Sequence, residues 1–310
     1  MGNDQNELVV TVRCITYNQE AYIRKCLEGI VMQRTNFRFE AIVHDDASTD
    51  HTPSIIQEFA EKYPDIIKPI FETENQYSKQ DGSLGRIMNA HTHGKYVAIC
   101  EGDDYWTDPD KLQKQVDFLE ANPDYGLVHT MYQTTDVTTG TISRTMLPYI
   151  DGQPIDDILL GNCYIATLTA CYRRELLDKI NTDYQKQGFL MGDFPLWLEI
   201  LKLTKIKCIP DFTANYNIVP QSATHQKEDK KRLAFAVSVR DIRLYYVKRF
   251  NLNHLFRTVY RDWLFYKSME KALNGDNFKS IYLFIKSHMY KKRNRRMFKK
   301  ALFHKKYREF

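Results

Sequence analysis

The sequence predicts an α/β fold, in which helices flank a mostly parallel sheet and the carboxyl-terminal part is helical. Between residues 8 and 218, short apolar runs alternate with helical patterns at intervals of about 25 to 30 residues, as in βαβ units. The runs VVTV and YVAIC are apolar throughout, which is typical of strands buried on both faces. After residue 226 the pattern is helical alone. We therefore predict two domains, residues 1–225 and 226–310.

The individual elements follow from the local pattern along the chain. Strands are expected where β-branched and other apolar residues cluster, at 8–16, 39–44, 66–72, 95–100, 127–133, 166–172 and 205–210. Helices are expected where apolar residues recur on one face, at 20–33, 53–63, 84–91, 111–119 and 194–204. Two long helices, 227–250 and 252–273, precede a turn at Asn274–Asp276. A third helix after that turn places five apolar residues on one face: Phe278, Ile281, Tyr282, Ile285 and Met289.

The composition is that of a globular protein. Of the 310 residues, 43% are hydrophobic and 27% are charged, which excludes a disordered chain. The sequence contains no run of about 18 apolar residues, so we expect no transmembrane helix. The first ten residues lack a basic segment followed by an apolar one, so we expect no signal peptide and a cytoplasmic location. The six cysteines form no CxxC pair, which favours reduced thiols over disulfides or a zinc site.

The net charge of +5 is unevenly distributed. Residues 286–310 contain eleven Lys or Arg and one Glu, whereas residues 1–285 contain 33 basic and 38 acidic side chains. An acidic body argues against binding to nucleic acid. The basic tail also contains aromatic residues, and this combination favours contact with an anionic membrane surface at the inner leaflet. Two alternatives stay open, which are a solvated helix and a tail that packs against the first domain.

Polar residues follow three of the predicted strands, where ligands bind in open α/β sheets. The first group is Thr16–Glu20, the second is His44–Asp50 and the third is Glu101–Trp106. Because parallel strands end at the same edge of a sheet, we expect these groups to lie side by side. The second group also has a simpler interpretation, in which Asp46 or Ser48 caps the following helix.

Three carboxylates in the third group, Glu101, Asp103 and Asp104, fall within four residues. Their mutual repulsion destabilises the fold unless a positive charge is present. Clustered oxygen ligands suit Mg²⁺ or Mn²⁺, which also bind substrate phosphates. The alternative is a solvated acidic turn, in which Asp108 or Asp110 caps the next helix.

Three sequence blocks, CITYNQEAYI, VHDDASTDHT and CEGDDYWTDPDKLQKQVDFL, resemble the ordered signatures of family 2 glycosyltransferases. That family has the GT-A fold, with a Rossmann-like, mostly parallel sheet. The resemblance covers about residues 8–220. It implies that Tyr17 stacks on a nucleotide base, with Thr16 and Asn18 beside it and Glu20 in the same nucleotide-sugar-binding loop.

The resemblance also gives roles to the acidic residues. Asp46 would accept a hydrogen bond from the base, with Asp45 adjacent. Glu101, Asp103 and Asp104 stand at the family's D-x-D motif, so Asp104 and Asp103 would be metal ligands. This sequence has Glu at the first position of the motif, and Glu can still accept a hydrogen bond from a ribose hydroxyl.

A late block, LMGDFPLWL, matches the position of the family's catalytic base, with Gly192 where many members have Glu. The resemblance makes Asp193 the general base, a role compatible with capping the helix that follows. Arg86 follows a glycine-containing loop and either pairs with a phosphate or is solvated. His225 lies where some relatives carry a histidine near the metal, with simple solvation as the alternative. Val219 stands where relatives more often have an earlier histidine.

These features together imply a metal-dependent, inverting glycosyltransferase that uses Mn²⁺ or Mg²⁺. It would move a sugar from a nucleotide donor, UDP-linked, to a hydroxyl of a glycan or lipid-linked acceptor, in the synthesis of bacterial cell-surface polysaccharide or glycolipid. The alternative is a non-catalytic module that binds nucleotide sugars or glycans on the same fold. The intact acids at Asp46, Asp103, Asp104 and Asp193 favour the enzyme. The sugar, the acceptor and the linkage depend on loops around 132–157, which no motif encodes.

Overall fold

The computed structural model describes residues 7–79, 81–144, 146, 151, 154–161, 163–220, 228–288 and 292–302. By its internal contacts the chain divides into two units. The first unit comprises Met1–Gln153, Tyr164–Lys186 and Glu199–Ile218. The second comprises Pro154–Cys163, Gln187–Leu198 and Val219–Phe310. Each unit is described by itself below.

Two segments from the middle of the sequence thus belong with the carboxyl-terminal helices. Hydrogen bonds explain why Gln187–Leu198 belongs to the second unit. The backbone N–H of Leu190 donates to the hydroxyl of Ser238 at 2.8 Å. The hydroxyl of Tyr246 also donates to the carbonyl of Pro195 at 3.3 Å. The domain boundary predicted at residue 225 remains a prediction, and the contacts add these earlier segments to the helical part.

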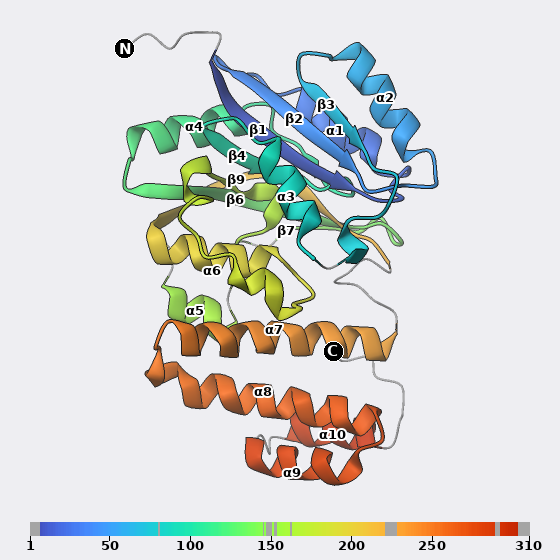
Figure 1. Cartoon of the computed structure of the whole chain (residues 1–310), viewed down its shortest axis with the longest axis vertical. Helices are drawn as coiled ribbons and strands as arrows, with labels where there is room; N and C mark the ends of the chain where they lie inside the picture. Colours follow the sequence, from blue (N-terminus) through green and yellow to red (C-terminus); the bar gives the residue numbers. More distant parts are fainter. Residues whose placement is uncertain are drawn as a thin grey trace. The chain divides into compact units, whose positions relative to one another are not determined.

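Strands and helices alternate in the first unit (Figure 1). Its strands are β1 (Leu8–Thr16), β2 (Arg38–Asp45), β3 (Ile67–Phe71), β4 (Tyr96–Ile99), β5 (Tyr105–Trp106), β6 (Tyr125–Asp136), β7 (Ile142–Arg144), β8 (Cys171–Arg173) and β9 (Lys205–Ile218). Its helices are α1 (Ile23–Val31), α2 (Thr52–Lys62), α3 (Ser83–Ala90) and α4 (Lys111–Ala121), and α6 (Asp193–Leu203) ends in it. The strands and helices expected before residue 121 all form, with small shifts at their ends.

The strands of the first unit form one sheet in the order β3-β2-β1-β4-β8-β6-β9-β5, with β7 paired to β6. Strands β3, β2, β1 and β4 are parallel to one another, as is β6 to β9. Strands β8, β5 and β7 join their neighbours antiparallel. The β1–β2 register pairs Thr16 with Asp45, so the carboxyl ends of these two strands coincide. This register places the first two predicted polar groups next to each other.

Two predicted strands differ from the structure. The segment expected at 166–172 begins as a 3-10 turn at Thr167–Thr169, and only Cys171–Arg173 is extended. The backbone N–H and the hydroxyl of Thr169 both donate to the carbonyl of Ala166, at 2.9 and 2.6 Å, which closes the turn locally. The strand expected at 205–210 continues to Ile218, because β9 pairs with β6 along its length across shifts in register.

The core of the first unit lies between the sheet and its helices. Four successive residues of β1, Val9–Val12, are buried, and so are Leu27 and Ile30 of α1. This burial on successive residues explains why the first strand is apolar without alternation. No disulfide joins any of the six cysteines, and five of them are buried.

The second unit is helical. It contains α5 (Ile155–Leu160), the start of α6, α7 (Asp229–Arg249), α8 (Asn253–Leu273), α9 (Asn277–Ser287) and α10 (Lys292–Leu302). Helix α8 lies beside α7, α9 and α10 (Figure 1). Leu233, Phe265, Met269, Met297 and Phe298 form part of its core. No helix among the described residues is long and apolar enough to cross a bilayer. The predicted fold class, a helix-flanked sheet with a helical carboxyl-terminal region, is confirmed.

Candidate active site

The loop after β1 is joined to the loop after β2 by reciprocal hydrogen bonds. The backbone N–H of Asn18 donates to the hydroxyl of Ser48, and Oδ1 of Asn18 accepts from the N–H of Thr49, both at 2.8 Å. The carboxylate of Glu20 accepts from the N–H of His51, also at 2.8 Å. In this structure the side chains of Asn18 and Glu20 therefore fix the two loops to each other. Their predicted contacts with a nucleotide stay predictions.

Thr16 and Tyr17 differ in exposure within the first of these loops. Thr16 is 1% exposed, and its hydroxyl donates to Oε1 of Gln19 at 2.7 Å. Its carbonyl accepts from the backbone N–H of Asp46 at 2.9 Å. Tyr17 is 48% exposed, which leaves a large aromatic surface at the carboxyl end of β1. Such a surface suits the stacking role predicted for Tyr17.

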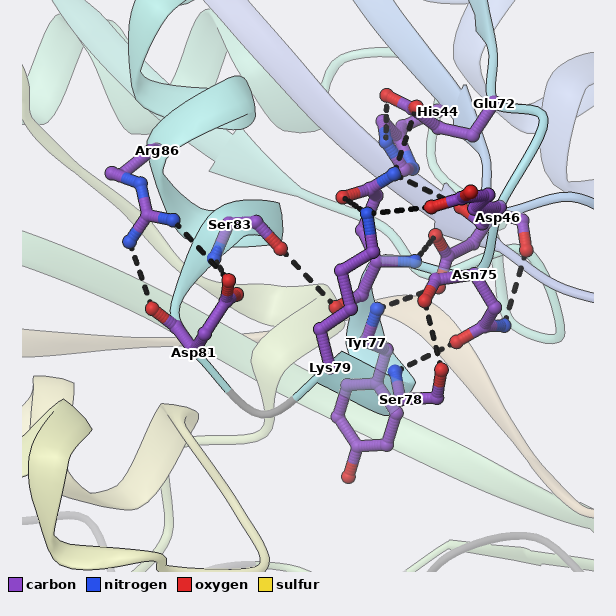
Figure 2. Close-up of polar contacts among 12 residues, drawn as sticks. His44, Asp46, Glu72, Asn75, Tyr77, Ser78, Lys79, Asp81, Ser83 and Arg86 are labelled. Atoms are coloured by element: carbon purple, nitrogen blue, oxygen red, sulfur yellow. Dashed lines mark hydrogen bonds and ion pairs between the residues drawn. The ribbon is translucent and has the colours of Figure 1, made fainter.

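Asp46 is buried and holds the chain segment that follows β3 (Figure 2). Its Oδ1 accepts from the backbone N–H of Gln76 at 2.6 Å, and its Oδ2 accepts from the N–H of Tyr77 at 3.0 Å. The side-chain amide of Asn75 donates to the Asp46 carbonyl at 3.1 Å. The helix-cap interpretation of Asp46 is wrong, because α2 begins at Thr52, whose N–H donates to Asp50 instead.

Only one oxygen of the neighbouring Asp45 carboxylate accepts a hydrogen bond among the described residues. Its Oδ2 accepts from the backbone N–H of Ser48 at 3.1 Å. The helix-cap interpretation of Ser48 is thus also wrong, since this residue closes a turn three residues after Asp45. The other oxygen, Oδ1, is buried and has no hydrogen-bond partner among the described residues. A buried acceptor without a partner is rare in folded proteins. Oδ1 of Asp45 can therefore accept a further hydrogen bond.

Arg86 lies near the start of α3 and is paired within its own loop (Figure 2). Its guanidinium donates to the carbonyl of Asp81 at 2.8 Å and lies 3.7 Å from the Asp81 carboxylate. Oδ1 of Asp81 also accepts from the N–H of Ser83, the first residue of α3, at 2.8 Å. The side chain of Arg86 is 64% exposed. The predicted contact with a phosphate stays a prediction and requires Arg86 to exchange Asp81 for the phosphate.

The acidic turn after β4 is anchored by the end of β9. The backbone N–H of Asn217 donates to Oδ1 of Asp104 at 2.8 Å. The side-chain amide of Asn217 donates to the carbonyl of Asp103 at 2.6 Å. Glu101 is exposed, Asp103 is half-buried and Asp104 is 2% exposed. A solvated turn is therefore the wrong interpretation for Asp104.

Burial controls the protonation of these acids. Burial raises the pKa of Asp104 well above its usual value, and the charge of Asp103 raises it further. The hydrogen bond from Asn217 and the charge of Glu101 make smaller contributions, the former lowering the pKa and the latter raising it. Burial also raises the pKa of Asp103. The two carboxylates are thus costly to ionise unless a cation is present.

This donor set fits a divalent metal. Mg²⁺ and Mn²⁺ prefer carboxylate oxygens, and Mg²⁺ is commonly bound by one or two carboxylates together with substrate phosphates. Asp103 and Asp104 supply two such groups. Across the described ranges, no group of three or more His, Cys, Asp or Glu side chains is arranged to hold a metal ion. The third ligand predicted at His225 lies outside the described residues.

Gly102 brings the acidic turn into contact with the first loop. Its backbone N–H donates to the carbonyl of Ile15 at 3.0 Å. A Cβ atom at this position would lie 2.4 Å from Oε1 of Gln19 and 2.6 Å from Oγ1 of Thr16, so only glycine fits. The loops after β1, β2 and β4 therefore lie side by side, as predicted from the sequence.

Sequence reasoning missed two residues of this site, Gln19 and Asn217. Gln19 lies inside the first quoted block, and its side chain accepts from Thr16 beside the acidic turn. Asn217 and Asn215 are both buried in β9, and the Asn215 amide donates to Oδ1 of Asn217 at 2.9 Å. The available signal was a pair of asparagines, spaced by two, near the end of this strand.

Asp193 is the first residue of α6 and belongs to the second unit. Its Oδ1 accepts from the backbone N–H of Phe194 at 2.8 Å, and the side chain is half-buried. Pro195 follows in the first turn of the helix, where no N–H is needed. Asp193 thus lies within the first turn of α6, and both its capping role and its catalytic role stay predictions.

Comparison with known proteins finds relatives in bacteria. An uncharacterised protein of Mycobacterium bovis is 39% identical over 171 residues, which are 54% of this chain and 47% of that protein. The chain spans about half the length of this relative. The Escherichia coli UDP-Glc:alpha-D-GlcNAc-diphosphoundecaprenol beta-1,3-glucosyltransferase WfgD is 25% identical over 205 residues, which are 66% of this chain and 74% of that enzyme.

Solved structures share the fold at low sequence identity. A fragment of S. aureus TarS in complex with UDP-GlcNAc has a TM-score of 0.57 at 16% identity and covers 97% of this chain and 93% of its own. The mannosyltransferase PcManGT from Pyrobaculum calidifontis, in complex with GDP-Man and Mn²⁺, has a TM-score of 0.53 at 18% identity, with coverage of 96% and 85%. The predicted GT-A fold is confirmed. The family described as Glycosyl transferase family 2 matches residues 11–180, more than half of the chain. The protein therefore belongs to family 2 of the glycosyltransferases.

Proposed function

We propose that the chain is a metal-dependent, inverting glycosyltransferase that moves a sugar from a UDP-linked donor to an acceptor hydroxyl. The observation that carries this proposal is the pair of buried acids, Asp103 and Asp104, fixed by Asn217 beside the loop of Thr16 and Gln19. A folded protein without a charged ligand gains nothing from burying these carboxylates together. A nucleoside diphosphate and its metal ion supply the missing charges.

The nucleotide is proposed to lie at the carboxyl ends of β1 and β2. Tyr17 would stack on the base, and Thr16, Asn18 and Glu20 shape the loop around it. Asp45 and Asp46 would recognise the base by accepting hydrogen bonds from its N–H groups. The unpartnered Oδ1 of Asp45 supports this assignment, and the oxygens of Asp46 that already accept from backbone each retain a second lone pair.

The metal site is proposed to consist of Asp104 and Asp103, with His225 as a further ligand. Bound Mn²⁺ or Mg²⁺ would neutralise the charge that develops on the leaving diphosphate. Glu101, which is exposed, would accept a hydrogen bond from the ribose. Arg86 would leave Asp81 to pair with a phosphate oxygen.

The base is proposed to be Asp193. Its carboxylate would take the proton from the acceptor hydroxyl as the oxygen attacks the anomeric carbon, and the bond to the diphosphate would break on the opposite side. One displacement of this kind inverts the anomeric configuration. The proton ends on Asp193 and the electron pair on the departing nucleotide.

The acceptor is proposed to be a glycan or a lipid-linked sugar in the synthesis of bacterial cell-surface polysaccharide or glycolipid. The name of the WfgD relative supports a sugar linked through a diphosphate to a polyprenol. The basic residues of 286–310 would bring the enzyme to the anionic inner face of the cytoplasmic membrane.

The test is a donor screen. The full chain is incubated with Mn²⁺ and, separately, UDP-Glc, UDP-GlcNAc and GDP-Man, and released nucleoside diphosphate is measured. We expect release from a UDP-sugar that stops in excess EDTA. Binding of a donor without any release, even when lipid-linked acceptors are added, would instead indicate a non-catalytic binding module. Release from GDP-Man alone would overturn the UDP assignment.

A further inference from the structure

One face of α9 is apolar and open to solvent. Phe278, Ile281, Tyr282 and Ile285 recur with the spacing of a single helix face, and we name them the α9 face. These residues are 89%, 43%, 56% and 55% exposed, respectively. Four large apolar side chains exposed side by side are unusual for a protein surface that contacts only water.

The other side of α9 fixes the helix in the second unit. The ring of Phe284 stacks on that of Phe298 in α10, with centroids 4.1 Å apart and planes inclined by 7°. It also lies 6.2 Å from the ring of Phe265 in α8. Ser280 and Ser287 are buried on this inner side. Helix α9 is therefore packed on its inner side, while the α9 face on its other side stays exposed.

Exposed basic residues lie on α9 and on its neighbour α10. Lys279 and Lys286 lie on α9 itself and are exposed. The ammonium of Lys286 lies 5.6 Å from the centre of the Tyr282 ring. Among the α10 side chains that the structure describes, Arg295, Arg296 and Lys299 are basic and exposed. Between residues 277 and 308 the sequence contains twelve Lys or Arg and no Asp or Glu, so no acid of this segment offsets the charge.

The charge decides which partner fits this face. A second copy of the chain would bring like charges together across the apolar contact, which opposes self-association. An anionic bilayer offers an apolar phase for the aromatic and aliphatic side chains and phosphates for the basic ones. We propose that α9 lies at the surface of an anionic membrane. The α9 face points toward the acyl chains, and the lysines and arginines of α9 and α10 contact the headgroup phosphates.

This inference deepens the membrane partner of the proposed function and rests on that function only for its biological purpose. It also places the membrane contact at a different part of the chain. Charge alone directs attention to residues 286–310, whereas the exposed face begins at Phe278, before the tail. Insertion of apolar side chains, rather than charge alone, then holds the protein on the bilayer.

The test is co-sedimentation of the full chain with vesicles of phosphatidylglycerol and phosphatidylcholine, and with vesicles of phosphatidylcholine alone. Wild-type protein should bind the anionic vesicles at least about tenfold more tightly, and added salt should reduce the difference. Phe278→Ser combined with Ile285→Ser should weaken binding to anionic vesicles about tenfold or more. Lys279→Gln combined with Lys286→Gln should weaken it by about tenfold and flatten its salt dependence.

The matched control is Ile142→Ser on β7, because Ile142 is 60% exposed and lies outside the helical unit. This control should bind vesicles as wild type does. The altered side chains are exposed, so circular dichroism and the thermal midpoint should be unchanged in every variant. Donor hydrolysis in solution should also persist in the α9 variants. If hydrolysis is absent from wild type while vesicle binding depends on the α9 face, the proposed function fails and this inference stands.

Three results would overturn the inference. The first is no binding of wild type to anionic vesicles at low salt. The second is unchanged binding of the Phe278→Ser, Ile285→Ser variant, which would leave charge alone as the cause. The third is a dimer in sedimentation equilibrium that this variant abolishes, which would make the face an interface between copies.

Discussion

The backbone N–H of Asn217 donates a 2.8 Å hydrogen bond to Oδ1 of Asp104, which lies 113 positions earlier in the sequence. The Asn217 side chain adds a 2.6 Å hydrogen bond to the carbonyl of Asp103. The end of β9 thus determines the position of both acids in the proposed metal site. Removal of these hydrogen bonds should therefore disturb the proposed metal site more than it destabilises the fold.

We predict that Asn217→Ala lowers kcat/KM by about tenfold or more, because small displacements of catalytic groups are costly to the rate. The variant keeps the backbone N–H to Asp104 and loses the side-chain hydrogen bonds with Asp103 and Asn215, so its stability should fall by about 2 kcal/mol. Steady-state kinetics and urea denaturation measure the two effects. The control is Asn122→Ala, which removes a similar 2.7 Å bond to the carbonyl of Phe118. Equal kinetic losses in both variants would contradict a role for Asn217 in the site.

Asp104→Asn tests the metal site. Asn retains an oxygen that can accept from Asn217 and loses the charge, so we expect turnover to be abolished while the fold is kept. Without metal, the variant should be more stable than wild type at pH 7 by on the order of 1 kcal/mol, since burial of a carboxylate with a raised pKa is unfavourable above its usual pKa. Mn²⁺ should raise the thermal midpoint of wild type but not that of Asp104→Asn.

The control for this variant is Asp117→Asn, an exposed acid on α4 whose carboxylate accepts from Gln113. It should leave activity and the response to Mn²⁺ unchanged. Full activity of wild type in excess EDTA, or of Asp104→Asn with Mn²⁺, would show that the metal assignment is wrong.

Asp193→Asn tests the general base. Asn can still accept from the N–H of Phe194, so α6 should begin at the same residue. We expect the rate to fall by about 10²–10⁴ while the affinity for nucleotide stays nearly constant. Single-turnover kinetics and calorimetric binding of UDP separate the two quantities. The control is Asp276→Asn, which caps α9 through Lys279 and should keep full activity. Normal turnover by Asp193→Asn would direct attention to another acid such as Glu199.

His129 on β6 gives a prediction for acid stability. This side chain is 3% exposed, and burial lowers its pKa from 6.5 to about 4. Between these values the unfolded chain binds the proton and the folded chain does not, so stability falls as the pH drops from 6.5 toward 4. The full loss from this group is roughly 3 kcal/mol, at about 1.36 kcal/mol per pKa unit.

We therefore expect His129→Gln to lose less stability than wild type between pH 6.5 and 4, as measured by urea denaturation at several pH values. His93→Gln, at an exposed position, should follow the wild-type curve. Parallel curves for wild type and His129→Gln would show that the buried imidazole does not control this pH range.

Local patterns in the sequence were enough for the first half of the fold. The apolar run of β1 and the helix pattern of α1 each depend on the period of side chains within about ten residues, which the sequence displays directly. The three polar groups could be placed together because parallel strands end at one sheet edge. The strand expected at 166–172 begins only at Cys171, because a threonine turn at Thr167–Thr169 competes locally with extension.

By itself, the sequence determined the alternation of strands and helices, the family motifs and the placement of acids at strand ends. Only the tertiary structure decided that Asn217 supports Asp104, that Asp46 holds Gln76 and Tyr77, and that the α9 face is exposed. The physical reason is that a buried polar group forms its hydrogen bonds with whichever segment packs beside it. Contacts between residues far apart in the sequence decide that segment, because they set the strand order β4-β8-β6-β9-β5. An apolar helix face is likewise identical in sequence whether or not another element covers it, so packing alone determines its exposure.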